Sequence, residues 1–236
     1  MNVNDLMLDY LRFIDTEDSR DHRNEDGSDK SFHASTFFEC LRKRWLARQP
    51  HIKRAEIDAP LLFRFKQGNL WEELYARAFM WKGILLEREV PLRDGEFSGR
   101  VDFLITPTEG LGIVELKTVH PFALNIIKSK GMYKHHKAQV MWYFDVMKRT
   151  EQWKEVSFMK LIYAGIADSR CMEFNIPYDP YFIEEIEADK AKLLDYYNNN
   201  IEPATLEKGN WQCKRCVFYE TYCKEDQEAG LNNIEL

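Results

Sequence analysis

Apolar residues in this chain follow two spacings, one typical of helices and one typical of strands. Helical spacing predicts helices over residues 35–48, 61–80, 136–148 and 183–198. Short apolar runs predict strands over residues 84–92 and 156–165, and a strand pair joined by a Pro/Gly turn within residues 99–119. One face of the helix over 61–80 carries the apolar residues Leu70, Trp71, Leu74 and Ala78. Helices and strands in this mixed order predict an α/β fold with a mixed central sheet flanked by helices.

Composition and motifs divide the chain into a core and three peripheral parts. Residues 15–30 are acidic and lack aliphatic and aromatic side chains, so they are predicted to form a linker outside the core. The predicted parts are an N-terminal helix with this linker, an N-terminal arm, the core, and a C-terminal cysteine cluster with a tail, at residues 1–30, 31–60, 61–200 and 201–236.

Composition also limits the classes of function. The 236 residues, 44% of them hydrophobic, suffice for one sizeable core with a small appendage. No apolar run reaches the roughly eighteen residues of a membrane span, and the acidic N-terminus lacks the features of a signal peptide. An intracellular, cytoplasmic protein is therefore expected. A net charge of −6 argues against a protein that coats nucleic acid indiscriminately.

Three charged residues interrupt the apolar strands within residues 99–119. Glu115 and Lys117 lie on one face of their strand, and pairing across the turn can bring Asp102 onto the same side. Two carboxylates on a buried strand favour a bound Mg²⁺ or Mn²⁺, and a lysine beside such an ion suits phosphodiester hydrolysis. The alternative is a weak pair of charges on a half-exposed strand.

The pattern Gly99-x-x-Asp102, twelve intervening residues and Glu115-Leu116-Lys117 resembles the core of PD-(D/E)XK nucleases. The resemblance implies a restriction-endonuclease-like fold, a divalent metal on Asp102, Glu115 and the backbone carbonyl of Leu116, and a catalytic role for Lys117. These nucleases hydrolyse DNA, which becomes the expected substrate.

Two further motifs resemble the RecB-like branch of these nucleases. Gln139 and Tyr143 match its Q-x-x-x-Y signature and are neighbours on a helix face, where they are expected to reach the lysine or a DNA phosphate. Glu72, four residues after Gly68, stands where this branch often has a histidine metal ligand. The adjacent Glu73 leaves the choice between the two acids open, and a plain surface acid is the alternative.

Four cysteines form a candidate metal centre. Cys213, Cys216 and Cys223 lie close together near the C-terminus, and Cys40 lies on a predicted basic amphipathic helix near the N-terminus. Their context resembles CRISPR-associated and AddB-like RecB-like nucleases, which implies a 4Fe-4S cluster in a lobe formed from both chain ends. Zn²⁺ is the alternative metal for four thiolate ligands. Cys171 is expected to be an ordinary buried or half-buried thiol.

A basic stretch without acids follows Lys117 and predicts a DNA contact, with a solvated surface as the alternative. Its candidate DNA-binding residues are Lys128, Lys130, Lys134 and Lys137. Three aromatic residues are candidates for base stacking: Phe122, Tyr133 and Trp142. His135 and His136 are expected in a solvated loop.

Taken together, these features predict a Mg²⁺- or Mn²⁺-dependent DNA exonuclease that acts on single strands or DNA ends. One alternative is a nuclease that processes CRISPR spacers together with partner proteins. Another is a non-catalytic DNA-binding or assembly module. The resemblance also allows a homo-oligomer and recombination partners.

Overall fold

The computed structural model describes residues 9–10, 12–13, 23–25, 28–167 and 170–229. The chain forms two compact units. The first, here called the end unit, consists of Met1–Phe32, Phe38–Phe63 and Ala188–Leu236; the second, the sheet unit, consists of His33–Phe37 and Arg64–Glu187.

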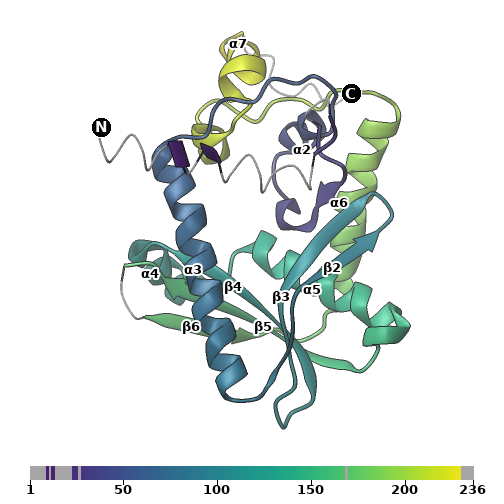
Figure 1. Ribbon diagram of the computed structural model, residues 1–236. Helices are drawn as coiled ribbons and strands as arrows, with labels where there is room; N and C mark the ends of the chain where they lie inside the picture. The colour runs from purple at the N-terminus through teal and green to yellow at the C-terminus, as the bar shows by residue number, and fades with distance from the viewer. Residues whose placement is uncertain (1–8, 11, 14–22, 26–27, 168–169, 230–236) are drawn as a thin grey trace. The chain divides into compact units, whose positions relative to one another are not determined.

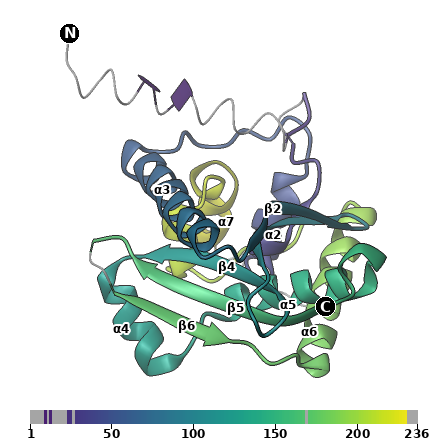
Figure 2. The same ribbon diagram turned by 60° about the horizontal axis from the view of Figure 1, so that its bottom comes forward.

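A mixed six-stranded sheet organises the chain (Figures 1 and 2). Its strands are β1 (Phe32–His33), β2 (Leu85–Asp94), β3 (Phe97–Ile105), β4 (Leu111–Val119), β5 (Val156–Gly165) and β6 (Cys171–Asn175). Strands β2, β3 and β4 pair antiparallel in that order, β5 lies parallel to β4, and β6 is antiparallel to β5. The mixed α/β fold predicted from the sequence is therefore confirmed.

The longer helices flank this sheet or extend from it. They are α3 (Ala59–Trp81), α4 (Pro121–Lys130), α5 (Lys134–Arg149) and α6 (Pro180–Asn198). Helix α3 covers one face of the sheet, and α5 lies on the other (Figures 1 and 2). The short helical elements are α2 (Leu41–Ala47), α7 (Lys224–Glu228), η1 (Ala34–Thr36), η2 (Glu151–Trp153), η3 (Trp211–Arg215) and η4 (Tyr219–Cys223).

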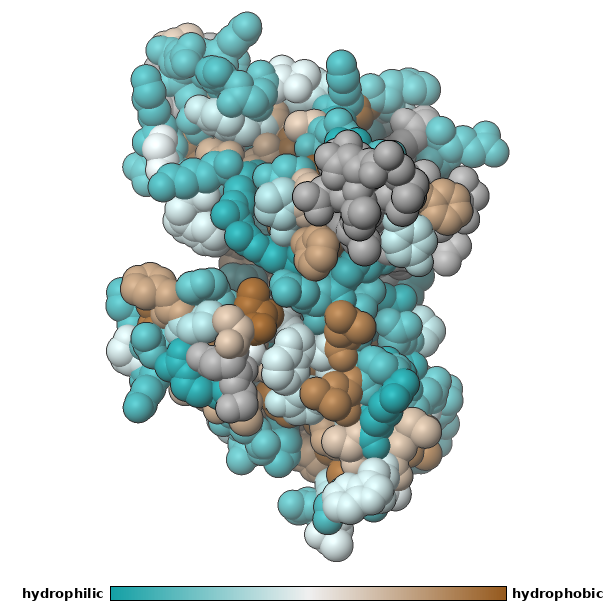
Figure 3. Space-filling view, turned by 60° about the vertical axis from the view of Figure 1, so that its left-hand side comes forward, coloured by the Kyte–Doolittle hydropathy of each residue, from teal (hydrophilic) through white to brown (hydrophobic). Residues whose placement is uncertain are grey.

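The buried face of α3 differs from the predicted apolar face. Leu70 and Leu74 are 71% and 57% exposed, whereas Trp71, Tyr75 and Phe79 pack on the sheet. Helix α3 is apolar around most of its circumference, so spacing alone does not select a face, and the larger aromatic side chains remove more apolar area from water. Figure 3, which brings the α3 side of the molecule forward, shows brown apolar side chains left exposed there.

The helix predicted over residues 35–48 starts later than expected. Residues 34–36 form the 3-10 turn η1, Phe38 has a left-handed backbone with φ of 59°, and the α-helix α2 begins at Leu41. Phe37 is fully buried in the sheet unit, with its ring centroid 5.8 Å from those of Phe97 and Trp142. Burial of this ring is incompatible with a helix that continues from residue 35.

Other expectations changed in detail. The basic stretch after Lys117 contains helix α4, and β6 was not predicted as a strand. Of the linker predicted at 15–30, only residues 23–25 and 28–30 lie within the described part of the chain. There Ser28 and Asp29 are buried, and Asp29 pairs with Arg54 at 2.8 Å, so this end of the segment does not behave as a solvated linker. Across the described residues, every helix is too short or too polar to cross a membrane.

Candidate active site

Asp102 and Glu115 lie side by side just beyond the point where the pairing of β3 with β4 stops. These strands pair through Phe103–Val114, Leu104–Ile113 and Ile105–Gly112, and the regular pairing stops there. In the next position, Asp102 Oδ2 accepts a hydrogen bond of 2.7 Å from the backbone N–H of Leu116. The carboxylate therefore occupies the point where the strands separate, as the sequence pattern predicts.

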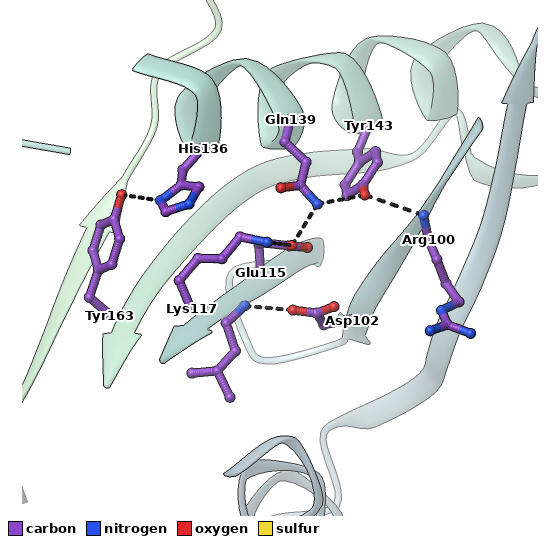
Figure 4. A network of polar contacts seen from close by, with 9 residues as sticks. Arg100, Asp102, Glu115, Lys117, His136, Gln139, Tyr143 and Tyr163 are labelled. Atoms are coloured by element: carbon purple, nitrogen blue, oxygen red, sulfur yellow. Dashed lines mark hydrogen bonds and ion pairs between the residues drawn. The ribbon is translucent and has the colours of Figure 1, made fainter. Parts of the chain in front are cut away.

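A hydrogen-bonded chain links Glu115 to Lys117 and to helix α5 (Figure 4). The Lys117 ammonium donates to Glu115 Oε1 at 2.7 Å, and Gln139 Nε2 donates to the same oxygen at 2.8 Å. Gln139 Nε2 also donates to the Tyr143 hydroxyl at 2.7 Å. Asp102, Glu115, Lys117, Gln139 and Tyr143 therefore lie close together, as expected. Gln139 and Tyr143 are linked to Lys117 through Glu115 and do not bond to it directly.

Tyr143 explains the glycine of the Gly99-x-x-Asp102 pattern. A Cβ atom at Gly99 would lie 2.3 Å from Tyr143 Cε1, closer than any real contact. The Tyr143 hydroxyl accepts a second hydrogen bond, of 3.3 Å, from the backbone N–H of Arg100. A residue without a side chain is therefore needed for α5 to approach β3 and hold this strand against the site.

Carboxylates outnumber cations in this site. Burial raises the pKa of Asp102 well above its ordinary value, and the neighbouring Glu115 raises it further. Burial by itself would lower the pKa of Lys117, but Glu115 and Asp102 outweigh it, so the pKa lies above its ordinary value. Lys117 is therefore an ammonium ion at neutral pH, and one ammonium among several buried acids leaves excess negative charge.

Glu72, and not Glu73, faces this charge cluster. Burial raises the pKa of Glu72, followed by the charges of Glu115 and Glu89. Glu73 instead bonds to Arg77 at 2.8 Å and Arg88 at 2.7 Å. The structure thus resolves the choice between the two acids that the sequence leaves open.

The donor set fits a hard divalent cation. Asp102, Glu115 and Glu72 supply carboxylate oxygens, and Glu115 Oε2 is buried with no hydrogen-bond partner in the described structure. An unpaired buried carboxylate oxygen is costly unless a cation compensates it. Among the described residues, however, no three His, Cys, Asp or Glu side chains form a ready-made metal site. Binding would therefore require the side chains to adjust.

His136 was missed by the sequence analysis, which placed it in a solvated loop. It lies on α5, where burial and the charge of Lys117 lower its pKa to about 2, so the imidazole is neutral. Its Nδ1 shares a hydrogen bond of 2.9 Å with the Tyr163 hydroxyl, which also accepts from the backbone N–H of Tyr133 at 3.2 Å (Figure 4). The available signal was its spacing, because residues three and seven apart lie on one helix face, the face of Gln139 and Tyr143.

The candidate DNA-binding residues have mixed environments. Lys134 pairs with Glu185 at 2.7 Å, and Lys137 pairs with Asp179 at 3.6 Å. Lys128 and Lys130 lie in the exposed last turn of α4. Among the aromatic candidates, Phe122 is 68% exposed, Tyr133 is half-buried, and Trp142 is buried in the core. Base stacking on Trp142 is therefore excluded in this conformation.

The four cysteines of the candidate metal centre lie in the end unit and influence one another's charge, but among the described residues no three His, Cys, Asp or Glu side chains form a metal site there. Burial raises the pKa of the Cys223 thiol to about 11, Arg42 opposes this, and Cys216, Cys40 and Cys213 add to it. The pKa values of Cys40 and Cys216 are also raised, first by burial. Tetrathiolate chemistry fits a soft metal centre, which would deprotonate these thiols on binding. Cys171 is exposed, contrary to expectation.

A mixed sheet flanked by helices, with two acids and a lysine where β3 and β4 separate, defines a protein of the restriction-endonuclease-like class. The chain belongs to the PD-(D/E)XK nuclease superfamily, whose family model matches residues 19–224. It is therefore a nuclease by family. A search of curated proteins found no match to this sequence.

Two solved structures show the same fold. One is an alkaline exonuclease (LHK-Exo) from Laribacter hongkongensis, with 16% identity over 73% of this chain and 90% of that chain and a TM-score of 0.52. The other is SSO0001, with 19% identity over 90% of this chain and 94% of that chain and a TM-score of 0.53. At these identities the likeness concerns the fold alone.

Proposed function

We propose that this protein is a Mg²⁺- or Mn²⁺-dependent DNA exonuclease that acts on single strands or DNA ends. The observation that carries the proposal is the buried Asp102–Glu115–Lys117 cluster, in which one Glu115 oxygen has no hydrogen-bond partner in the described structure. Membership of a nuclease superfamily and a fold shared with an alkaline exonuclease support it. A non-catalytic DNA-binding module would have no use for a buried excess of negative charge.

In the proposed mechanism, Asp102, Glu115, the Leu116 carbonyl and Glu72 hold the divalent ion. The bound ion would supply charge neutralisation for the phosphate and a lower pKa for water. Lys117 donates hydrogen bonds from its ammonium group, so it orients the attacking water and stabilises charge that develops on the phosphate oxygens. Gln139 and Tyr143 fix Glu115 and β3, while neutral His136 adds no charge beside Lys117.

Digestion of end-blocked substrates tests this function. Single-stranded DNA labelled internally is expected to be shortened in Mg²⁺ or Mn²⁺ and to remain intact in EDTA, because cleavage needs a bound cation to lower the pKa of water and to neutralise charge on the scissile phosphate. Blocking the 5′ or the 3′ end in turn is expected to stop digestion in one case only. Cleavage of DNA blocked at both ends would indicate an endonuclease, and no cleavage of any substrate would favour the binding module.

We also propose that the end unit carries a 4Fe-4S cluster on Cys40, Cys213, Cys216 and Cys223, as in the RecB-like branch. Their mutual electrostatic influence on thiol pKa supports this ligand set, and binding would require the four side chains to move closer together. Gln227 Nε2 lies 3.4 Å from Cys213 Sγ, and Gln212 Oε1 accepts the Cys40 backbone N–H at 3.0 Å, so side-chain amides contact Cys213 and the backbone of Cys40. A nuclease of the RecB-like branch with such a cluster would work with partner proteins of recombination or of CRISPR adaptation.

Metal analysis distinguishes this centre from zinc. An anaerobic preparation is expected to be brown, with about four iron and four sulfide ions per chain. Cys216→Ser is expected to lose both and to lower the melting temperature, because the cluster joins distant parts of the chain. The matched control is Cys171→Ser, which changes an exposed thiol outside the cluster and should keep the iron. Stoichiometric zinc in place of iron would contradict the proposal.

A further inference from the structure

An ion pair at the edge of the active site has no role in the mechanism above. Arg100 Nη2 lies 3.3 Å from Glu89 Oε1, and the two side chains are 52% and 47% exposed. Exposed ion pairs stabilise a fold little, so this one is a weak structural element. Both members nevertheless influence the site, because the charges of Glu89 and Arg100 shift the pKa of Glu72 in opposite directions.

Strand geometry directs this pair toward the metal-binding side. Arg100 and Asp102 are two residues apart on β3 and therefore lie on the same face. On β2, Arg88 is opposite Phe103 and Val90 is opposite Val101, which puts Glu89 level with Asp102 along the strand, and its carboxylate reaches the Arg100 guanidinium. The backbone of Arg100 is held by the Tyr143 hydroxyl, and its side chain extends away from Tyr143 (Figure 4). The guanidinium is thus attached to a fixed point next to the catalytic carboxylates.

The backbone at Glu89 is unusual for a strand. Its φ is 52°, in the left-handed region that side chains other than glycine adopt rarely. A β-bulge or irregularity between Leu85 and Glu87 shifts the register of the same strand shortly before it. Strain of this kind is typical of functional sites, where the surrounding structure maintains it. It serves here to bring the Glu89 carboxylate to Arg100.

We propose that Arg100 binds a backbone phosphate of the DNA strand next to the scissile bond, and that Glu89 holds the guanidinium in place and competes with this phosphate. The inference rests on the proposed function, since it supplies that site with a cation for its anionic substrate. A guanidinium matches the geometry of a phosphate and forms two parallel hydrogen bonds with it. Arg100 is well placed for this role because half of its side chain is open to solvent beside Asp102.

Two substitutions are expected to act in opposite directions on DNA binding. The full chain would be titrated with labelled single-stranded DNA in EDTA, between about 50 and 200 mM salt. Arg100→Gln should weaken binding about five- to tenfold and reduce the slope of log K against log salt by ~0.7, the loss of one phosphate contact. Glu89→Gln should tighten binding about two- to fivefold, because a competing carboxylate is removed.

The chain provides a matched control pair and a test of coupling. Arg149 lies 3.4 Å from Asp94, its side chain is 53% exposed, and both residues lie away from the carboxylate cluster. Arg149→Gln and Asp94→Asn should leave the salt slope unchanged. The double variant Arg100→Gln/Glu89→Gln should bind like Arg100→Gln, since Glu89 acts through the guanidinium. Arg100→Lys keeps the charge and should keep the slope.

Specific results would overturn this inference. An unchanged slope in Arg100→Gln, or weaker binding in Glu89→Gln, would mean that the pair is structural. The proposed function can fail independently: DNA binding with the expected slopes but no cleavage in Mg²⁺ or Mn²⁺ would retain the phosphate site and remove the exonuclease. Cleavage in Mg²⁺ or Mn²⁺ together with an unchanged salt slope in Arg100→Gln would retain the exonuclease and remove the phosphate site. Should Arg100→Gln not fold, Glu89→Gln and Arg100→Lys still decide the question.

Discussion

Lys117→Met is expected to lower the rate of DNA cleavage by about 10²- to 10³-fold or more, and to lower the melting temperature of the metal-free protein because it removes the cation among the buried carboxylates. The methionine keeps most of the aliphatic stem but removes the ammonium that bonds to Glu115 at 2.7 Å. Without it, water and the developing phosphate charge lose their hydrogen-bond donor. Gel assays of labelled single-stranded DNA under single-turnover conditions measure the chemical step directly.

Lys160→Met is the matched control for this substitution. Lys160 lies on the adjacent strand β5, pairs with Glu173 at 2.7 Å and has a side chain 26% exposed, against 22% for Lys117. The two substitutions remove the same charge from similar surroundings, and only one of them is in the site. Equal cleavage rates for wild type and Lys117→Met would contradict the role assigned to Lys117.

Asp102→Asn is expected to abolish cleavage and, at the same time, to stabilise the metal-free protein. The asparagine oxygen can still accept the Leu116 N–H, which Asp102 accepts at 2.7 Å, but it carries no charge to repel Glu115. Stabilisation of about 1 kcal/mol, or ~2–4 °C in Tm for a chain of this size, is typical when a functional site loses its unfavourable charge. Thermal unfolding in EDTA measures this gain.

The pH dependence of stability follows from the same carboxylate. Because burial, and then Glu115, raise the pKa of Asp102 in the folded protein, the folded state retains a proton that the unfolded chain has lost. Stability of the metal-free wild type should therefore fall as the pH rises from the ordinary pKa of aspartate through the raised one. In Asp102→Asn this dependence should be weaker, and added Mg²⁺ or Mn²⁺ should stabilise the variant less than the wild type.

Asp189→Asn is expected to change stability in the opposite direction from Asp102→Asn. Asp189 pairs at 2.7 Å with Arg44, whose side chain is almost fully buried, so the substitution removes the carboxylate that bonds to a buried cation. We expect a loss of about 3–5 kcal/mol from this variant, against the gain from Asp102→Asn. A lower melting temperature for Asp102→Asn in EDTA would show that Asp102 is paired in the apo protein and would remove the argument for a cation site.

Local patterns predicted the position of the buried carboxylates, because alternation along a strand fixes which side chains share a face. Alternation along residues 99–119 and a short turn suffice to bring Asp102, Glu115 and Lys117 to one place. Gln139 and Tyr143 follow from helical spacing in the same way. The sequence could not predict which of Glu72 and Glu73 faces the carboxylates. Neighbouring residues on a helix point only about 100° apart, so the packing of α3 decides which of the two turns inward.

Packing also overrode several local signals. Of the predicted apolar face of α3, only Trp71 packs on the sheet, where it is joined by Tyr75 and Phe79. Spacing predicted a helix from residue 35, but Phe37 is buried and the helix begins at Leu41. His136 has no distinguishing sequence context, yet its burial in the fold and the neighbouring charge of Lys117 lower its pKa and keep it neutral. Glu89 lies in an ordinary polar strand by sequence and acquires its left-handed backbone only within the sheet.

By itself, the sequence determined the strands β2 to β5, the acids and lysine on β3 and β4, and the nuclease superfamily, because these depend on spacing over a few residues. Only the tertiary structure decided which charges are buried together, where a carboxylate oxygen is left without a partner, and how Arg100 meets Glu89. The physical reason is that burial and electrostatic repulsion depend on distances between segments far apart in the chain, which no local pattern specifies.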